Sequence, residues 1–310
     1  MTIHLLQVPY DSGHRAQRMG RGPLHLVERG AALDRLRRVG PDDARLVPVE
    51  TEAAFPTESG TAFELHRRVS EAVAGATRVG ALPIVLSGNC NSAIGTVSGL
   101  QAADPDVPLG VVWFDGHGDC NTPETFTGTF LDAMGLSTLT GRCWQALCAT
   151  VPGFAPVPDE NVILVGAHGA DQGALGVLAA SGMAHVRAAD VSAQGAAAAL
   201  GPALDAMARR GVERIYVHLD MDVLDAAWAP ANEFAPEGGL FPDQLAACIG
   251  EVTRRFIIGA AAVASYDPAC DHEDWVLGAA LGFLELVARS RAADVPGSPR
   301  KGCFRARSME

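Results

Sequence analysis

The stretch that most constrains this chain is an apolar run followed by alternating polar residues. Residues 111–114, Val-Val-Trp-Phe, are typical of a buried strand, and Asp115, His117 and Asp119 follow at a spacing of two. Successive side chains of a strand point to opposite faces, so these three share one face if the chain stays extended. Two carboxylates and an imidazole at a buried strand end are costly unless a cation or a partner holds them. The stretch therefore predicts a cation site.

Predicted strands and helices alternate along the chain. Apolar runs predict strands at 3–8, 45–49, 83–87, 109–114, 162–166, 214–219 and 257–266. Helical spacing of apolar positions, or a proline at a helix start, predicts helices at 23–29, 62–79, 92–100, 129–139, 196–209, 241–255 and 275–289. This alternation predicts an α/β fold, with right-handed crossovers and a mostly parallel sheet covered by helices on both faces.

Composition and charge narrow the class of protein. The chain has 310 residues, 48% of them hydrophobic, without a break in composition, so we expect one domain at 1–290 and a C-terminal extension at 291–310. A net charge of -12 argues against nucleic acid or an anionic membrane as partner, because phosphate binding depends on Lys and Arg. The sequence shows neither a signal-peptide pattern nor an apolar run long enough to span a membrane, so we expect a cytoplasmic protein.

The cysteines do not form a recognisable framework. There are seven, an odd number, and they are scattered: Cys90, Cys120, Cys143, Cys148, Cys248, Cys270 and Cys303. Neither a set of disulfides nor a zinc ribbon is predicted from this spacing.

Other metal-type side chains also occur at predicted strand ends. In parallel sheets, functional groups collect beyond the carboxyl ends of the strands. Besides the first stretch, residues of this kind at strand ends are Cys90, Asp220, Asp222, Ser265 and Asp267. We therefore expect all of them along one edge of the sheet.

The donor types indicate which metal this edge would bind. Four aspartates, one imidazole and a thiol form an oxygen-rich set that suits a hard or borderline ion such as manganese. Five or six ligands exceed what one tetrahedral ion needs, so the economical interpretation is two ions that share bridging carboxylates and activate a water. The alternative is that each aspartate caps a helix or loop.

Four segments resemble the arginase/agmatinase (ureohydrolase) superfamily. Residues 112–124, Val-Trp-Phe-Asp-Gly-His-Gly-Asp-Cys-Asn-Thr-Pro-Glu, resemble its second metal motif. Residues 218–225, with 238–240 downstream, resemble the family's next motif. Residues 87–99 resemble its first motif, and residues 9–23 resemble its N-terminal loop. The resemblance implies a three-layer α/β/α fold, two Mn²⁺ ions and hydrolysis of a carbon–nitrogen bond in a guanidino or amidino small molecule. It also implies a homo-oligomer.

The resemblance carries roles to individual residues. It implies that Asp115 and Asp220 bridge the ions, and that His117 and Asp222 complete one of them. Asp119 would complete the other ion and act as the catalytic residue that passes a proton to the leaving amine. The sixth metal ligand would be Cys90, and Asn121 would bind substrate.

Several positions depart from the arginase pattern. Cys90 stands where the family has its first histidine ligand; a thiolate can replace it, although a buried thiol without a metal is the alternative. Ser265 stands where arginases have the glutamate that grips the guanidinium, and the active-site histidine falls near Leu131 or Asp132. We therefore expect a substrate other than free arginine, such as an N-hydroxylated compound. Asp132 and Asp267 are candidates, with Ser265, for binding it.

Two other classes of function stay open at this point. One is a non-catalytic member that keeps the fold as a scaffold or binding module. The other is a zinc-dependent deacylase with one ion, because deacetylases resemble this fold and use an Asp/His/Asp trio. The additional Asp119 and Asp222 argue against the single-ion alternative.

Overall fold

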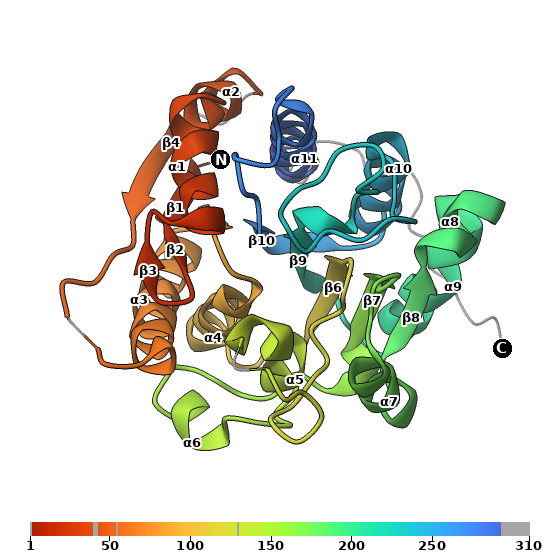
Figure 1. Cartoon of the computed structure of the whole chain (residues 1–310), viewed down its shortest axis with the longest axis horizontal. Coiled ribbons are helices and arrows are strands. Elements are labelled where there is room, and N and C mark those ends of the chain that lie inside the picture. Colours follow the sequence, from red (N-terminus) through yellow and green to blue (C-terminus); the bar gives the residue numbers. More distant parts are fainter. Residues whose placement is uncertain (1, 40–42, 54, 129, 293–310) are drawn as a thin grey trace, which may run out of the picture.

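A single parallel sheet of eight strands organises the computed structural model, which describes residues 2–39, 43–53, 55–128 and 130–292 (Figure 1). The strand order is β4-β1-β5-β10-β9-β6-β7-β8. The strands are β1 (Thr2–Val8), β4 (Asp43–Pro48), β5 (Leu82–Ser87), β6 (Leu109–Asp115), β7 (Val162–Gly166), β8 (Ala184–Arg187), β9 (Arg214–Asp220) and β10 (Ile257–Ala264). A separate antiparallel pair consists of β2 (Tyr10–Asp11) and β3 (His14–Arg15).

Helices cover both faces of the sheet, as Figure 1 shows. On one face lie α1 (Gly22–Glu28), α2 (Ala32–Val39), α8 (Ala188–Gln194), α9 (Ala196–Arg209), α10 (Pro242–Thr253) and α11 (Trp275–Ala292). On the other lie α3 (Glu58–Arg78), α4 (Ala93–Ala103), α5 (Gly135–Leu139) and α7 (Gln172–Ala180), with the short α6 (Gln145–Cys148) beyond them. The α/β/α arrangement expected from the sequence is confirmed.

Alternating burial along β6 shows why the sheet needs two helical layers. Val112 and Phe114 pack into the core on the α9–α11 face, whereas Val111 and Trp113 pack into the core on the α3–α5 face. All four side chains are completely buried. A parallel strand with apolar residues on both faces is stable only when both faces are covered.

Some elements were not predicted. Strand β8 and helices α2, α7 and α8 are short, and they carry few buried residues because they lie near the edges of the sheet. Residues 131–134 form a 3-10 turn, η3 (Leu131–Met134), before α5, where one longer helix was expected. The structure describes nothing beyond residue 292, so most of the predicted extension lies outside it. No helix among the described residues is long and apolar enough to cross a membrane.

Candidate metal centre

The ends of four neighbouring strands bring the predicted ligands together. Strands β5, β10, β9 and β6 are adjacent in the sheet, and Cys90, Ser265, Asp220 and Asp115 lie at or just after their carboxyl ends. Ligand-type atoms form three groups, each with its atoms within 4.8 Å of one another: Cys90, Asp115 and Asp220; Cys90, Asp119 and Asp132; and Asp115, His117 and Asp222. The structure thus brings these residues to one edge of the sheet, as the sequence led us to expect, and their role as metal ligands stays a prediction.

The local backbone differs from the sequence-based expectation. Strand β6 ends at Asp115, and the chain then turns, with φ of 88° at Gly118 and 48° at Asp119. The prediction that 115–119 stays extended is wrong, because the left-handed conformation at these two residues interrupts the pleat. As a result, His117 and Asp119 belong to different groups of potential ligands.

A second turn places the carboxylates that follow β9. Asp220 is the last residue of the strand, and Asp222 lies in the 3-10 turn η5 (Met221–Val223), not on an extended segment. The backbone N–H of Asp222 donates to Asp220 Oδ1 at 2.9 Å. The two carboxylates thus converge through a capped turn, although the sequence suggested the face of a strand.

Asp115 is fixed by three hydrogen bonds. Its Oδ1 accepts from the backbone N–H groups of His117 at 2.5 Å and Gly118 at 2.7 Å, and its Oδ2 accepts from Trp113 Nε1 at 2.8 Å. The Trp113 ring in turn stacks on His218, with ring centroids 3.7 Å apart. These contacts set the direction of a carboxylate that belongs to two of the ligand groups.

The side of the centre that contains Cys90 is equally ordered. The Cys90 thiol donates to Asp220 Oδ2 at 2.8 Å, and its sulfur lies 3.2 Å from Ser265 Oγ. Asp132 accepts hydrogen bonds from the backbone N–H groups of Cys90 and Asn91 and from Asn89 Nδ2, at 2.7 to 3.0 Å. Asp132 therefore anchors the turn that carries the thiol.

Charge in this buried edge is poorly compensated by the described residues. Burial, followed by the charge of Asp222, raises the pKa of Asp115, and burial with the charge of Asp115 raises the pKa of Asp119 well above its ordinary range. Burial opposes the charged form of Asp222, but the hydrogen bond with His117 lowers the pKa of that carboxyl. Asp119 Oδ2 is buried and has no hydrogen-bond partner among the described residues. A bound cation would compensate the charge of these carboxylates.

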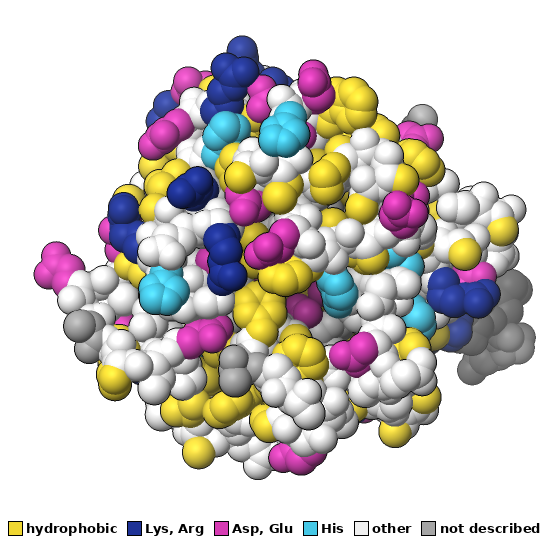
Figure 2. Space-filling view, viewed as in Figure 1, with side chains coloured by type: hydrophobic (Ala, Val, Ile, Leu, Met, Phe, Trp, Pro, Cys, Tyr) yellow, Lys and Arg dark blue, Asp and Glu magenta, His cyan; other side chains and the backbone are white. Residues whose placement is uncertain are grey.

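A cavity of about 420 Å³ opens onto His117, Asp119, Asp132, Asp220 and Asp222, whereas Asp115 and Cys90 are completely buried and do not line it. Apart from the ligand-type residues, its wall consists of Arg18, Met19, Asn121, Phe126, Phe130, Ala133, Gly169, Asp171, Ala174, Asn232, Phe234 and Ser265. Figure 2 shows hydrophobic, acidic and histidine side chains close together near the centre of one face. The aromatic rings of Phe130 and Phe234 lie 5.8 Å apart. The cavity thus has a carboxylate-rich floor and a partly aromatic wall.

The four residues predicted to bind substrate have different surroundings. Asn121, Asp132 and Ser265 line the cavity, and Asn121 Nδ2 donates to Asp171 Oδ2 at 3.0 Å. Asp267 is not among the residues lining the cavity; its Oδ1 accepts from the backbone N–H of Ala269 at 2.9 Å. A role for Asp267 in substrate binding stays a prediction.

Sequence patterns did not reveal two further features of the cavity. Asn232 Nδ2 donates to the Ser265 carbonyl at 2.8 Å, which ties the loop after β9 to the end of β10. Phe130 and Phe234 come from loops far apart in the chain: Phe130 was expected inside the helix predicted at 129–139 but precedes η3, and Phe234 belongs to no predicted element. Only the loop 232–240, with its Asn, Pro and Gly residues, marked the region as irregular.

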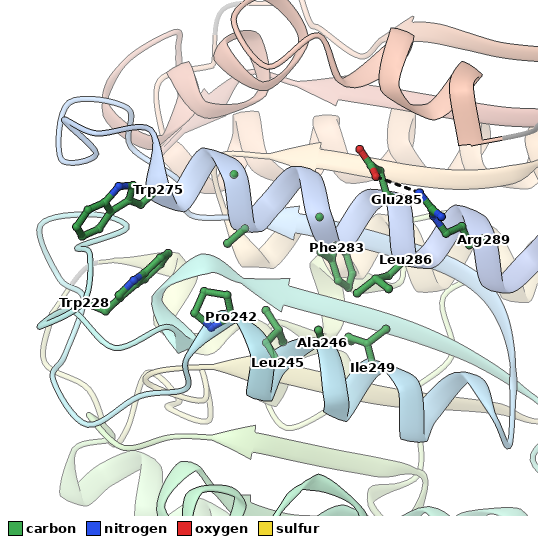
Figure 3. Close-up of a pocket in the computed structure, with 13 residues that line it drawn as sticks. Trp228, Pro242, Leu245, Ala246, Ile249, Trp275, Phe283, Glu285, Leu286 and Arg289 are labelled. Atoms are coloured by element: carbon green, nitrogen blue, oxygen red, sulfur yellow. Dashed lines mark hydrogen bonds and ion pairs between the residues drawn. The ribbon is translucent and has the colours of Figure 1, made fainter.

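A second cavity, of about 540 Å³, lies between α10 and α11 (Figure 3). Trp228 and Trp275 stack at one end, with ring centroids 5.8 Å apart, and Glu285 pairs with Arg289 at the other. Its wall is largely apolar and contains none of the grouped ligand-type residues. The residues that the sequence predicts to bind metal therefore lie at or next to the first cavity and not at the second.

The fold and the first cavity define a member of the arginase family. Residues 1–286 match the model of that family, described as "Arginase family", and the chain belongs to it. The resemblance seen in the sequence is thereby confirmed.

Individual relatives can then be compared. The chain is 26% identical over 293 residues to an arginase of Bacillus subtilis (strain 168), which covers 92% of this chain and 97% of the relative. It is 27% identical over 253 residues to arginase-1 of Homo sapiens, covering 77% of this chain and 76% of that protein. A crystal structure of Bacillus subtilis arginase superposes with a TM-score of 0.83 at 25% identity, covering 93% of this chain and 98% of the other.

More distant structures share the fold. The formimidoylglutamase of Bacillus subtilis subsp. subtilis str. 168 matches with a TM-score of 0.70 at 14% identity, covering 93% of this chain and 86% of that one. At this identity the likeness concerns the fold alone.

Proposed function

We propose that this protein is a hydrolase that uses two divalent metal ions to cleave a carbon–nitrogen bond in a guanidino or amidino small molecule other than free arginine. The observation that carries the proposal is the buried Asp119 Oδ2, which has no hydrogen-bond partner among the described residues and lies at a cavity floor with His117, Asp220 and Asp222. Cys90 and Asp115, the other two predicted ligands, are completely buried next to these residues. Membership of the arginase family supports the class of reaction.

The proposed ligands divide into two positions that share carboxylates. One position has His117, Asp222 and Asp115, and the other has Cys90, Asp119 and Asp115, with Asp220 next to both. The donor set fits two divalent ions, and its oxygen-rich character supports manganese for at least one of them. Bound ions would supply Lewis-acid activation of a water molecule and of the substrate.

The chain itself would orient the reactants and move a proton. Three hydrogen bonds keep Asp115 in position, so that neither of its oxygens needs to reorient. Asp119 Oδ2, which has no donor among the described residues, is free to accept a proton from the attacking water. We propose that it then passes this proton to the leaving nitrogen, which is the general acid/base step that C–N hydrolysis requires.

Two features of the cavity support a substrate other than arginine. A neutral hydroxyl at Ser265 cannot pair with a guanidinium as a carboxylate does. Phe126, Phe130 and Phe234 present aromatic surface, over which a flat amidine or guanidine can lie. A less basic head group, such as an N-hydroxylated guanidine, would fit a position where Ser265 supplies a hydroxyl in place of a carboxylate. We retain Asn121, Asp132, Ser265 and Asp267 as proposed substrate-binding residues.

The remaining expectations are part of the same proposal. We expect a cytoplasmic protein from the sequence patterns described above, and a homo-oligomer from the family resemblance. The net charge of -12 supports a small-molecule substrate over nucleic acid.

The test is hydrolysis of a panel of compounds by purified full-length protein loaded with stoichiometric manganese. Arginine, N-hydroxylated guanidines, agmatine-like amines and formimino compounds would be assayed for urea, substituted urea and ammonia. We expect turnover of at least one compound other than arginine. Asp119→Asn should reduce kcat at least about 100-fold, as for loss of a general acid/base.

The matched control is Glu124→Gln, which changes an exposed acid on the same loop outside the cavity wall and should leave kcat unchanged. If metal-loaded protein releases no product from any compound, the proposed function fails and a non-catalytic role is favoured. If arginine proves the best substrate, the proposal on specificity fails while the class of reaction stands.

A further inference from the structure

Cys90 contacts two of the other positions at which the sequence departs from the arginase pattern, Ser265 and Asp132. Cys90 Sγ lies 3.2 Å from Ser265 Oγ, and the backbone N–H of Cys90 donates to Asp132 Oδ2 at 3.0 Å. These residues are separated by 42 and 175 positions in the chain. The departures are therefore one connected change in the site, on the side away from His117.

Ligand-type atoms converge on the Cys90 side of the site, and the described residues do not provide a hydrogen-bond donor for every one of them. Sγ of Cys90 and carboxylate oxygens of Asp119 and Asp132 lie within 4.8 Å of one another. Asp119 is only 8% exposed, and within the part of the chain that the structure describes its Oδ2 has no hydrogen-bond partner. An unpartnered buried oxygen beside a thiol is the arrangement that a bound cation would satisfy.

The two proposed metal positions differ in donor type. Asp115, His117 and Asp222 offer only oxygen and nitrogen, whereas the position next to Cys90 includes sulfur. Thiolates favour zinc, cobalt and iron over manganese more strongly than imidazole and carboxylate do. The difference lies in side chains held in place by the hydrogen bonds described above.

We propose that the position next to Cys90 selects a thiophilic divalent ion, so that the centre holds two different metals. This inference rests on the proposed two-metal function. When the ion binds, the Cys90 S–H bond breaks, a sulfur–metal bond forms, and the proton leaves to solvent. Ser265 Oγ–H, 3.2 Å away, then donates to the thiolate sulfur, which gives this serine a role in supporting the metal ligand.

The experiment is a titration of metal-free, full-length protein with Co²⁺, followed by absorption spectroscopy. A thiolate bound to Co²⁺ produces a sulfur-to-cobalt charge-transfer band in the near ultraviolet, which carboxylate and imidazole ligands do not produce. We expect the band in the native protein and in Cys248→Ala, which removes a buried thiol in α10 outside the cavity. Cys90→Ser should lack it, and Ser265→Ala should retain it at a shifted wavelength.

Selectivity supplies a second measurement. Zinc binds most nitrogen and oxygen sites more tightly than manganese does, so the informative quantity is the change in the zinc-to-manganese affinity ratio. Replacing the thiol by the imidazole that relatives are expected to carry, Cys90→His, should lower this ratio about tenfold or more. Circular dichroism would verify that each variant is folded, and Cys90→Ala serves if Cys90→Ser is not.

The outcomes separate this inference from the proposed function. A native protein without the charge-transfer band, a Cys90→Ser variant that keeps it, or an unchanged ratio in Cys90→His would overturn the inference, even if the manganese-loaded protein hydrolyses amidines. Conversely, a sulfur-dependent cobalt site in a protein with no hydrolytic activity would uphold the metal selectivity while the proposed function fails.

Discussion

The floor and the wall of the active-site cavity are built in different ways. The floor consists of His117, Asp119, Asp220 and Asp222, with the completely buried Asp115 and Cys90 next to them, at or just after the ends of adjacent strands. The wall consists of Arg18, Phe126, Phe130 and Phe234, which come from loops and from the 3-10 turn η1 (Arg18–Arg21). The floor is largely buried, whereas Phe234 is 46% exposed. Rigid strand ends therefore present the groups for chemistry, and loops present the surface that meets the substrate.

The side chains of the floor and of the wall also differ in the contacts that hold them. Asp115, Asp220 and Asp222 each accept at least one hydrogen bond from the backbone or a buried side chain, whereas Asp119 Oδ2 has no partner among the described residues. In the wall, the ring centroids of Phe130 and Phe234 lie 5.8 Å apart, and Arg18 Nε lies 2.9 Å from Asp11 Oδ2. Changes in the floor should affect every substrate, whereas changes in the wall should alter the preference among substrates.

The largest expected effect is that of Asp220→Asn in the floor. This change removes a charge that lies next to both proposed metal positions and that accepts from the Cys90 thiol. We expect metal affinity to fall about 100-fold or more, which exceeds the usual effect of losing a residue that only supports a metal ligand. We also expect loss of turnover for all substrates. Isothermal titration with Mn²⁺ and steady-state assays would measure both.

Asp225→Asn is the matched control for that change, because its carboxylate only accepts from the backbone of Ala227 on the same loop. Retained activity in Asp220→Asn would mean that the floor residues are not needed for the reaction. The proposed difference in role between floor and wall would then be wrong.

An intermediate effect is expected for Trp113→Phe, which leaves every proposed ligand in place. The change removes the hydrogen bond to Asp115 Oδ2 and part of the stack on His218. We expect metal affinity to fall about tenfold and the free energy of unfolding to fall by about 1–3 kcal/mol. Metal titration and urea denaturation would test this.

Trp144→Phe controls for loss of an indole elsewhere, since Trp144 Nε1 contacts only Met134 Sδ. If Trp113→Phe lowered stability but left metal affinity unchanged, the hydrogen bond to Asp115 would support the fold alone.

The smallest expected effect is that of Phe234→Ala in the wall. Loss of its contact with Phe130 should raise KM about 2- to 10-fold with little change in kcat, given the usual energy of an aromatic pair. The size of the effect should also differ between flat and flexible substrates. Phe241→Ala, a similarly exposed phenylalanine outside the cavity, is the control. A fall in kcat for every substrate would mean that Phe234 has the role predicted for floor residues.

The floor was largely predictable because it follows from a topological rule. Metal-type side chains directly after apolar runs must meet at one edge once the strands are parallel and adjacent, and Asp115, Asp220 and Cys90 do so. The prediction was less accurate for local geometry. The left-handed turn at Asp119 could not be inferred, since a non-glycine residue rarely adopts that conformation.

The wall was not predictable in the same way. Phe130 and Phe234 are in contact only because two loops, after β6 and β9, fold over the same cavity. Neither loop has a periodic pattern that fixes where its side chains point, and pairs so far apart in sequence depend on the packing of everything between them.

By itself, the sequence determined the layered α/β fold and the set of residues that would form a metal-binding edge, because strand periodicity and strand ends are local properties of the chain. Only the tertiary structure decided that Asp132 anchors the Cys90 turn, that Ser265 lies against the thiol, and that no described residue donates to Asp119 Oδ2. Such contacts join segments 42 to 175 residues apart, and their geometry depends on how the sheet and its loops pack.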